Sequence, residues 1–174
     1  MQLTPIVEKF ILHWGEMGSR WGVNRTVAQI HALLYLSPKP LHAEEIAETL
    51  EVARSNVSTS LKELQGWGIV RVVHVLGDRR DHFESMKDVW EMFQQVLDER
   101  KRREIDPTIA MLKECLAEAS KGQGADETKR RLNDLLDFFE TMSAWYRQVR
   151  AMPAAMTRRF VRMGGKLHKL LSAV

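Results

Sequence analysis

Large apolar residues recur every three or four positions along most of the chain, with short polar breaks between the runs. The first run covers 4–20, and its spacing is that of an amphipathic helix with one buried face. A second run begins after Asn24, a residue type that caps helix starts, and it stops at the two prolines of 37–40, which cannot continue a helix. We therefore expect the chain to open with two helices that pack through their apolar sides.

Two further helices, joined by a three-residue turn, are predicted next. The first covers 43–50, and 51–53 form the turn. In the second, Val57, Leu61 and Leu64 keep helical spacing through the stretch RSNVSTSLKEL, although Ser, Thr and Asn each cost about half a kcal/mol in a helix interior. Core packing of this apolar row must therefore stabilise the helix, and its small polar residues have another purpose.

The polar side of this helix is suited to contact with DNA. The residues that lie about 100° to 160° around the helix axis from Val57 are Ser55, Ser58, Thr59 and Lys62. Small hydroxyl side chains let a helix backbone approach base edges closely, and they donate hydrogen bonds to bases or phosphates. We therefore predict a recognition helix that enters the major groove.

A β-hairpin with a basic tip is predicted directly after the recognition helix. Two glycines end that helix, and a β-branched run at 69–75 is followed by a turn and a shorter strand at 81–84, which is the pattern of a hairpin. Arg79 and Arg80 stand at the tip, where guanidinium groups suit phosphates or the minor groove. The acids expected to support them by hydrogen bonds are Asp78 and Asp81. Short helix, turn, second helix and hairpin is the order of a winged helix-turn-helix.

The rest of the chain is predicted to be helical. We expect one helix over about 86–104, begun by Ser85 in an S-x-x-D pattern. A second helix is expected to start at Pro107, and a third to cover 126–151. A last basic helix contains Gly164–Gly165, where a kink or stop is expected. The predicted fold class is mainly α with a small β-hairpin, a winged helix-turn-helix plus long dimerisation helices.

These elements divide the chain into three parts by role. We expect an N-terminal packing or dimerisation helix over 1–22, a winged helix-turn-helix DNA-binding domain with its following linker helix over 23–104, and a C-terminal helical dimerisation region over 105–174. One winged helix reads about one half-site, and specific affinity usually requires two half-sites about 34 Å apart. A homodimer is therefore expected. The alternative is that the large apolar residues outside the DNA-binding domain form a core within one chain.

Composition and charge narrow the partners and the compartment. With 26 Lys and Arg against 23 Asp and Glu, the net charge is only +3, so local basic groups must meet an anionic partner. The single cysteine, Cys115, excludes an intramolecular disulfide and predicts a reducing, cytoplasmic setting. Charged residues interrupt every stretch long enough to span a bilayer, so no membrane partner is expected.

The stretch 41–83, LHAEEIAETLEVARSNVSTSLKELQGWGIVRVVHVLGDRRDHF, resembles MarR-type winged helix-turn-helix transcriptional regulators. Its segments RSNVSTSLKEL, GWGIV and GDRRDHF are most similar to the GbsR branch, although the second wing strand is shorter than that family's usual one. The resemblance implies a homodimeric regulator, with repression favoured over activation, on pseudo-palindromic DNA, and some members respond to small osmoprotectant-related ligands. The positions it implies on the recognition helix and wing are Ser55, Asn56, Ser58, Thr59, Lys62, Arg79 and Arg80.

Sequence-specific binding of double-stranded DNA is the predicted function. The candidate DNA-binding residues are Arg54, Ser55, Asn56, Ser58, Thr59, Lys62, Arg79 and Arg80. Two other functions stay open: a protein-binding winged-helix adaptor, which exposed Leu or aromatic residues on the 55–62 face would favour, and non-specific architectural DNA binding, which the modest net charge disfavours. An enzyme is not expected, because the sequence has no glycine-rich phosphate loop, nucleophile elbow or paired acid–base motif.

No metal site or cofactor is predicted. The six histidines include no pair at metal-ligand spacing on one helix face, and Cys115 is expected to be inert rather than a redox switch. A small-molecule effector stays open, but its binding residues are unknown. An aromatic cage for a quaternary ammonium ligand would draw on residues for which core packing is the favoured role, namely Trp14, Trp21, Trp90, Trp145 and Tyr146.

Overall fold

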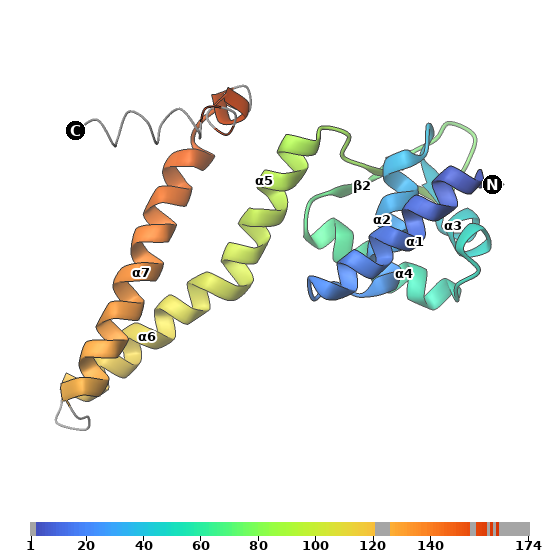
Figure 1. Ribbon diagram of the computed structural model, residues 1–174. Helices are drawn as coiled ribbons and strands as arrows, with labels where there is room; N and C mark the ends of the chain where they lie inside the picture. Colours follow the sequence, from blue (N-terminus) through green and yellow to red (C-terminus); the bar gives the residue numbers. More distant parts are fainter. Residues whose placement is uncertain (1–2, 121–125, 154–155, 160, 162, 164–174) are drawn as a thin grey trace. The chain divides into compact units, whose positions relative to one another are not determined.

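The structure is a computed structural model that describes residues 3–120, 126–153, 156–159, 161 and 163. The chain divides into two compact units, residues 1–96 and 97–174, and each is described by itself. Figure 1 shows their helices and the small sheet. As the sequence predicted, the fold is mainly α, and short antiparallel strands follow the fourth helix.

Four helices build most of the first unit: α1 (Pro5–Arg20), α2 (Arg25–Leu36), α3 (Ala43–Leu50) and α4 (Arg54–Gly66). Asn24 caps α2 as predicted, because its side-chain oxygen accepts a hydrogen bond from the Thr26 amide at 2.8 Å. The turn between α3 and α4 contains Glu51 in the left-handed region, with φ 53°, a conformation that glycine adopts more readily. The short helix, the three-residue turn and the second helix all lie where the sequence placed them.

The sheet has three strands instead of the two predicted. Its strands are β1 (Leu41–His42), β2 (Val70–His74) and β3 (Asp81–Ser85), in the order β1-β3-β2 with both pairings antiparallel. Strand β1 could not be predicted, because two residues are too few to show the alternation of a strand. Leu41 lies opposite Phe83 and His42 opposite His82, so β1 connects the start of α3 to the base of the wing.

The core of the first unit fixes the orientation of α4. Val57, Leu61 and Leu64 are buried against apolar side chains from α2 and α3, which include Ile30, Leu33 and Ile46. Burying a side chain of this kind contributes roughly 1.5–3 kcal/mol relative to leaving it exposed. The three α4 residues together therefore outweigh the poor helix propensity of the polar residues between them.

The helix after the wing starts later than the sequence predicted. Helix α5 (Val89–Arg100) is capped by Asp88, whose carboxylate oxygen accepts from the amides of Trp90 and Glu91 at 2.8 and 3.1 Å. Ser85 is not the cap, since its hydroxyl donates to the carbonyl of Met86. The predicted single helix over 86–104 is therefore wrong at both ends: it begins at Val89, and α5 stops at Arg100, where a π-helical turn, η1 (Lys101–Ile105), follows.

The end of α2 is closed by a lysine from the segment that precedes α5. The Lys87 ammonium donates to the carbonyls of Leu34, Tyr35 and Ser37 at 2.9, 2.7 and 3.0 Å. A cation at a helix C-terminus interacts favourably with the helix dipole and with carbonyls that have no partner within the helix. Lys87 thus holds the entry to α5 against the core of the first unit.

The second unit contains the last residues of α5, the η1 turn, α6 (Asp106–Glu118) and α7 (Asp126–Arg150). Pro107 lies in the first turn of α6, as predicted. Asp98 accepts from the Tyr146 hydroxyl at 2.5 Å and from Arg150 Nε at 2.7 Å, which joins α7 to the end of α5. The expected break at Gly164–Gly165 lies outside the described residues. Among the described residues, no helix is both long and apolar enough to cross a bilayer.

Candidate nucleic-acid interface

Helix α4 has one buried side and one exposed polar side. Val57, Leu61 and Leu64 lie in the core, where Ser60 is buried beside them, while the other small polar residues and Lys62 lie on the rest of the helix surface. Of the predicted contact residues on α4, those that are exposed are Arg54, Ser55, Asn56, Thr59 and Lys62, and Ser58 is half-buried. The N-cap residue, Ala53, makes no side-chain hydrogen bond. The two faces lie as the spacing predicted, and packing rather than capping stabilises the helix.

Arg54 is held in place at the start of α4. Its Nε donates to a Glu44 carboxylate oxygen at 2.9 Å, and its Nη1 donates to the Ser58 hydroxyl. A cation in the first turn of a helix faces the positive end of the helix dipole, and the Glu44 carboxylate offsets that cost. The Thr59 hydroxyl donates to the Ser55 carbonyl at 3.2 Å. The N-terminal turn of α4 therefore presents an oriented guanidinium group beside small hydroxyl groups.

The two arginines of the wing have different surroundings. Arg80 Nε donates to both carboxylate oxygens of Asp78 at 2.9 and 3.1 Å, and Arg80 Nη2 donates to one of them at 2.5 Å. These hydrogen bonds lower the pKa of Asp78 well below its usual range. Arg79 is exposed. Asp81 was predicted to support a wing guanidinium, but its carboxylate instead lies 3.9 Å from His74 Nδ1 across the hairpin.

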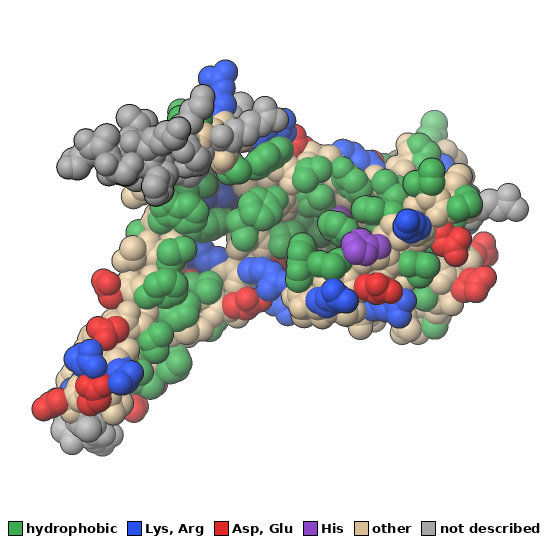
Figure 2. Space-filling model, in the orientation of Figure 1, with side chains coloured by type: hydrophobic (Ala, Val, Ile, Leu, Met, Phe, Trp, Pro, Cys, Tyr) green, Lys and Arg blue, Asp and Glu red, His purple; other side chains and the backbone are tan. Residues whose placement is uncertain are grey.

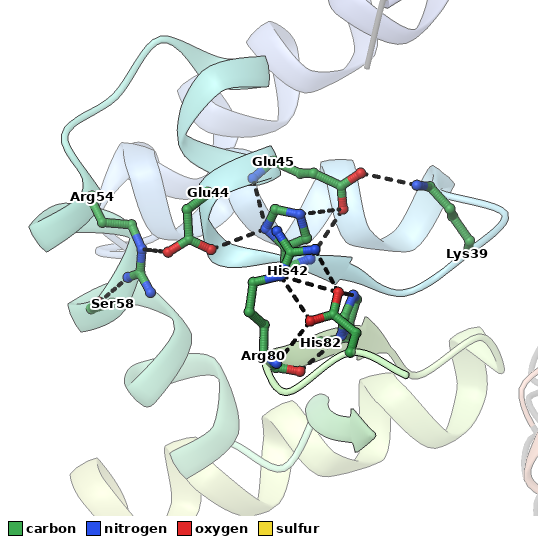
Figure 3. Close-up of polar contacts among 9 residues, drawn as sticks. Lys39, His42, Glu44, Glu45, Arg54, Ser58, Arg80 and His82 are labelled. Carbon is green, nitrogen blue, oxygen red and sulfur yellow. Dashed lines mark hydrogen bonds and ion pairs between the residues drawn. The ribbon is translucent and has the colours of Figure 1, made fainter. Parts of the chain in front are cut away.

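A polar cluster links the start of α4 to the wing (Figure 3). Its members are Lys39, His42, Glu44, Glu45, Arg54, Ser58, Asp78, Arg80 and His82. Glu44 has its pKa lowered to about 2, first by the hydrogen bond from Arg54 and also by that from His42. For Glu45, burial raises the pKa, but hydrogen bonds from Lys39 and from the His42 backbone outweigh it and the net shift is downward. Both carboxylates are therefore charged at neutral pH, and they compensate the nearby cations.

His42 and His82 occupy the centre of this cluster. Their rings meet edge to face with centroids 5.5 Å apart, because β1 pairs with β3 at these two residues. His42 Nδ1 lies 3.3 Å from the Glu45 amide nitrogen and 3.0 Å from a Glu44 carboxylate oxygen. Nδ1 accepts from the amide in one ring tautomer and donates to the carboxylate in the other, so the tautomer determines which bond forms.

The sequence contained one sign of this cluster that the prediction missed. Residues 42–45 have a capping-box spacing, with His42 as the N-cap of α3 and Glu45 three residues later. A histidine is an unusual residue in that position, where Ser, Thr, Asp and Asn are preferred. The approach of Glu44 to Arg54 spans ten positions of sequence and depends on how α3 packs against α4, so no local pattern could reveal it.

Among the described residues, no group of three or more His, Cys, Asp or Glu side chains is placed to hold a metal ion. Trp14 stacks with Phe10 and lies beside His31, as expected of a packing residue, and the Tyr146 hydroxyl is engaged by Asp98. Cys115 is half-buried in α6, with its Sγ 3.6 Å from Met111 Sδ.

Comparison with known proteins gives three results. The model of the MarR family matches residues 21–81, which include α2, α3, α4 and most of the wing. The HTH-type transcriptional repressor GbsR of Bacillus subtilis is 25% identical over 130 residues, which are 72% of this chain and 72% of that protein. A crystal structure of a transcriptional regulator, 21% identical, covers 84% of this chain and 96% of its own with a TM-score of 0.70, which supports the fold.

Proposed function

We propose that the chain binds double-stranded DNA sequence-specifically as a homodimer. The premise is that it is a MarR-type transcriptional regulator, as the resemblance of residues 41–83 implied and the family match over 21–81 confirms. In this proposal α4 enters the major groove, and the β2–β3 wing contacts the adjacent backbone and minor groove. The observation that carries it is the two-sided character of α4: three apolar residues anchor the helix in the core, and its opposite side is small, polar and exposed.

The exposed side of α4 suits base readout. Ser55, Asn56 and Thr59 are short, so the helix backbone can approach the base edges, and their polar groups can bond to bases or to phosphates. Lys62 and Arg54 add positive charge at the two ends of this face, where phosphates border the groove. The face has no exposed Leu or aromatic residue, which is why the protein-binding adaptor is the weaker interpretation.

The wing supplies charge on the other side of the recognition helix. Arg79 is exposed and is suited to a phosphate or to the minor groove, while Arg80 adds charge beside it with its guanidinium held by Asp78. Asp78 keeps the Arg80 guanidinium, and Glu44 the Arg54 guanidinium, in a defined orientation before DNA arrives, and pre-ordering of this kind lowers the entropy cost of binding.

A homodimer would present two such surfaces to the two halves of a pseudo-palindromic operator. We propose residues 23–104 as the DNA-binding domain with its linker helix, and 1–22 and 105–174 as the material of the dimer contact. Apolar side chains on α7 support this assignment because they are exposed in the single chain: Leu135, Phe138, Met142 and Trp145. Figure 2 shows hydrophobic side chains gathered along the helices of this unit.

The direction of regulation is proposed from the relative. The similar protein from Bacillus subtilis is named a transcriptional repressor, and we propose repression for this chain as well. Control by a small-molecule effector is part of the same proposal through the family resemblance, and no residue is assigned to it. The expected compartment of a DNA-binding regulator is the cytoplasm.

Selection of duplexes from a random-sequence library by the purified chain, at near-physiological salt, tests the proposal. Enrichment of a two-fold symmetric motif is the expected result and would supply the operator. Retention without enrichment would indicate architectural binding to the DNA backbone, and no retention would return the adaptor function to first place. Either of the last two results contradicts sequence-specific regulation.

Charge-reversal variants then test the assigned surfaces on the selected duplex. Lys62→Glu should lower affinity at least tenfold, because it places an acid beside phosphates. Arg79→Ala combined with Arg80→Ala should weaken binding to all sequences, and the slope of log K against log salt should fall by about 0.9 for each phosphate that the wing no longer neutralises. An unchanged slope would remove the wing from the interface.

A further inference from the structure

The tip of the wing is a tight turn over Val75–Asp78. The Asp78 amide donates to the Val75 carbonyl at 3.0 Å, and Gly77 has φ 85°, the value that the third position of a type II turn requires. The turn is completed by the Arg80 amide, which donates to the Asp78 side chain at 3.0 Å. These bonds fix the backbone on both sides of Leu76, which occupies the second position of the turn.

Leu76 is the most exposed large apolar residue of the described chain. Its relative exposure is 103%, and the neighbouring Val75 is 40% exposed. A polar residue would meet the backbone requirements of this position equally well, since the second position of a type II turn restricts φ and not side-chain polarity. The turn thus carries an apolar side chain that the folded chain does not bury, on a backbone that hydrogen bonds fix on both sides.

The charged residues next to Leu76 indicate which kind of binding partner the wing tip can contact. Arg79 is exposed, and within the described part of the chain the structure gives it no hydrogen bond or ion pair. The Arg80 guanidinium, by contrast, is already held by both oxygens of Asp78. The tip therefore offers one apolar side chain and one uncommitted cation within four residues of each other.

The minor groove of DNA has both complementary properties. Its negative potential attracts an inserted arginine, most strongly where the groove is narrow, and apolar side chains such as leucine can enter between base steps and partly unstack them. Pyrimidine–purine steps unstack most easily. An apolar residue at this place would therefore add a preference for the sequence beside the half-site, where α4 makes no contact.

We propose that Leu76 is a wedge that enters the minor groove beside each half-site, so that affinity depends on how easily the base step there is deformed. This inference rests on the proposed DNA-binding function and adds a specificity-determining residue to it. Arg79 supplies the charge that brings the tip into the groove, and Leu76 supplies the apolar contact. Burial of a whole leucine side chain raises affinity on the order of tenfold or more.

The test uses the full-length chain and the selected duplex, labelled at its two ends for fluorescence energy transfer so that DNA bending is measured together with affinity. Leu76→Ala should lower affinity about tenfold and reduce the bend, while the salt slope stays unchanged because every phosphate contact remains. Leu36→Ala, an exposed leucine at the end of α2, is the matched control and should leave both quantities unchanged. Arg79→Ala should lower the salt slope.

A second set of duplexes carries TA, CA or AA at each step flanking the half-sites. The unaltered chain should prefer TA or CA over AA at one flanking step, and Leu76→Ala should lose that preference. If the unaltered chain binds the operator and Leu76→Ala matches it in affinity, bend and step preference, the wedge is wrong while the proposed function stands. If Leu76→Ala changes the sedimentation of the free protein, Leu76 belongs to a protein contact and the wedge is also wrong. No binding by the unaltered chain overturns both proposals.

Discussion

His31 is a buried histidine that the fold keeps neutral. It is 6% exposed, and its Nε2 lies 3.1 Å from Met92 Sδ. Burial, with a smaller contribution from the nearby Lys87 ammonium, lowers the pKa of His31 from 6.5 to about 4. Between these two values the unfolded chain binds a proton that the folded chain does not, so the free energy of unfolding decreases as the pH falls from about 6.5 to about 4.

Replacing His31 should remove most of that pH dependence. The two pKa values correspond to a loss on the order of 3 kcal/mol across the window, and His31→Leu should flatten the curve because leucine has no proton to bind. Urea unfolding at pH 7.0, 5.5 and 4.5 measures the effect. His13→Leu, at an exposed position of α1, serves as the control and should keep the dependence of the unaltered chain. Equal curves for the two variants would contradict the assignment to His31.

At the residue scale, the sequence showed contacts between near neighbours and missed those made by folding. The support of Arg80 by Asp78 was predicted because two positions separate them and a turn brings them together. Asp81 was misassigned because β3 pairs with β2 in a register that places it opposite His74. Glu44 and His42 were not recognised near the arginines that are proposed to face DNA, since their approach depends on the packing of α3 and on strand β1.

Elements in this fold end where backbone requirements change, and the two glycines at the end of α4, Gly66 within its last turn and Gly68 just beyond it, show this most clearly. Gly66 has a helical backbone, and a Cβ atom added there would meet no other atom within 4 Å, whereas Gly68 has φ 72° and an added Cβ would lie 2.7 Å from Gln95. Gly66→Ala should therefore stabilise the protein by about 0.5–1 kcal/mol through helix propensity. Gly68→Ala should destabilise it by about 1–2 kcal/mol. Denaturant unfolding of this matched pair checks both signs, and equal effects would contradict the different backbone roles.

The start of α5 gives a second test at this scale. Asp88→Ala should cost about 1 kcal/mol of stability, because it removes the acceptor for two backbone amides. Asp88→Asn keeps a capping oxygen and should stay within a few tenths of a kcal/mol of the unaltered chain, as measured by thermal unfolding. A full loss in Asp88→Asn as well would show that the charge, and not the cap, is what stabilises the helix start.

Helices with clear apolar spacing were predictable from the sequence, while very short or irregular elements were not. Helix α3 was predicted with its observed ends from its apolar spacing, and α2 from its apolar spacing together with its Asn24 cap. Strand β1 is too short for any periodicity, and the π-helical turn η1 interrupts a charged stretch, KRREI, that carries no breaker residue. Ser85 and Asp88 are both suitable as the N-cap of α5, and the course of the chain after β3 determines which of them caps the helix.

At the scale of the whole molecule, α7 has two apolar rows one residue apart. One row, Leu136, Phe139, Ser143 and Tyr146, is half-buried or buried within the second unit. The other row, Leu135, Phe138, Met142 and Trp145, is exposed. A helix with apolar residues on a wide part of its surface is usually buried on that whole part, so the exposed row supports the proposed contact with a second copy.

Phe138→Glu should weaken the proposed dimer at least tenfold, because it places a charge in the middle of an apolar contact. Asn133→Glu introduces the same acid on another side of α7, at an exposed polar position, and should leave the dimer intact. Sedimentation velocity over a range of protein concentrations measures both. A concentration-independent monomer for the unaltered chain would end the dimer proposal, and equal behaviour of the two variants would move the contact away from this row.

The strand order β1-β3-β2 also affects how the protein behaves when crowded. Unpaired strand edges recruit strands from other molecules and start aggregation. Here β3 lies in the middle of the sheet, one border is only the two residues of β1, and the other border, β2, carries Arg71, which is tied to Glu84 on β3. The short β1 border and the charged Arg71 on β2 therefore disfavour edge-to-edge pairing with neighbouring molecules.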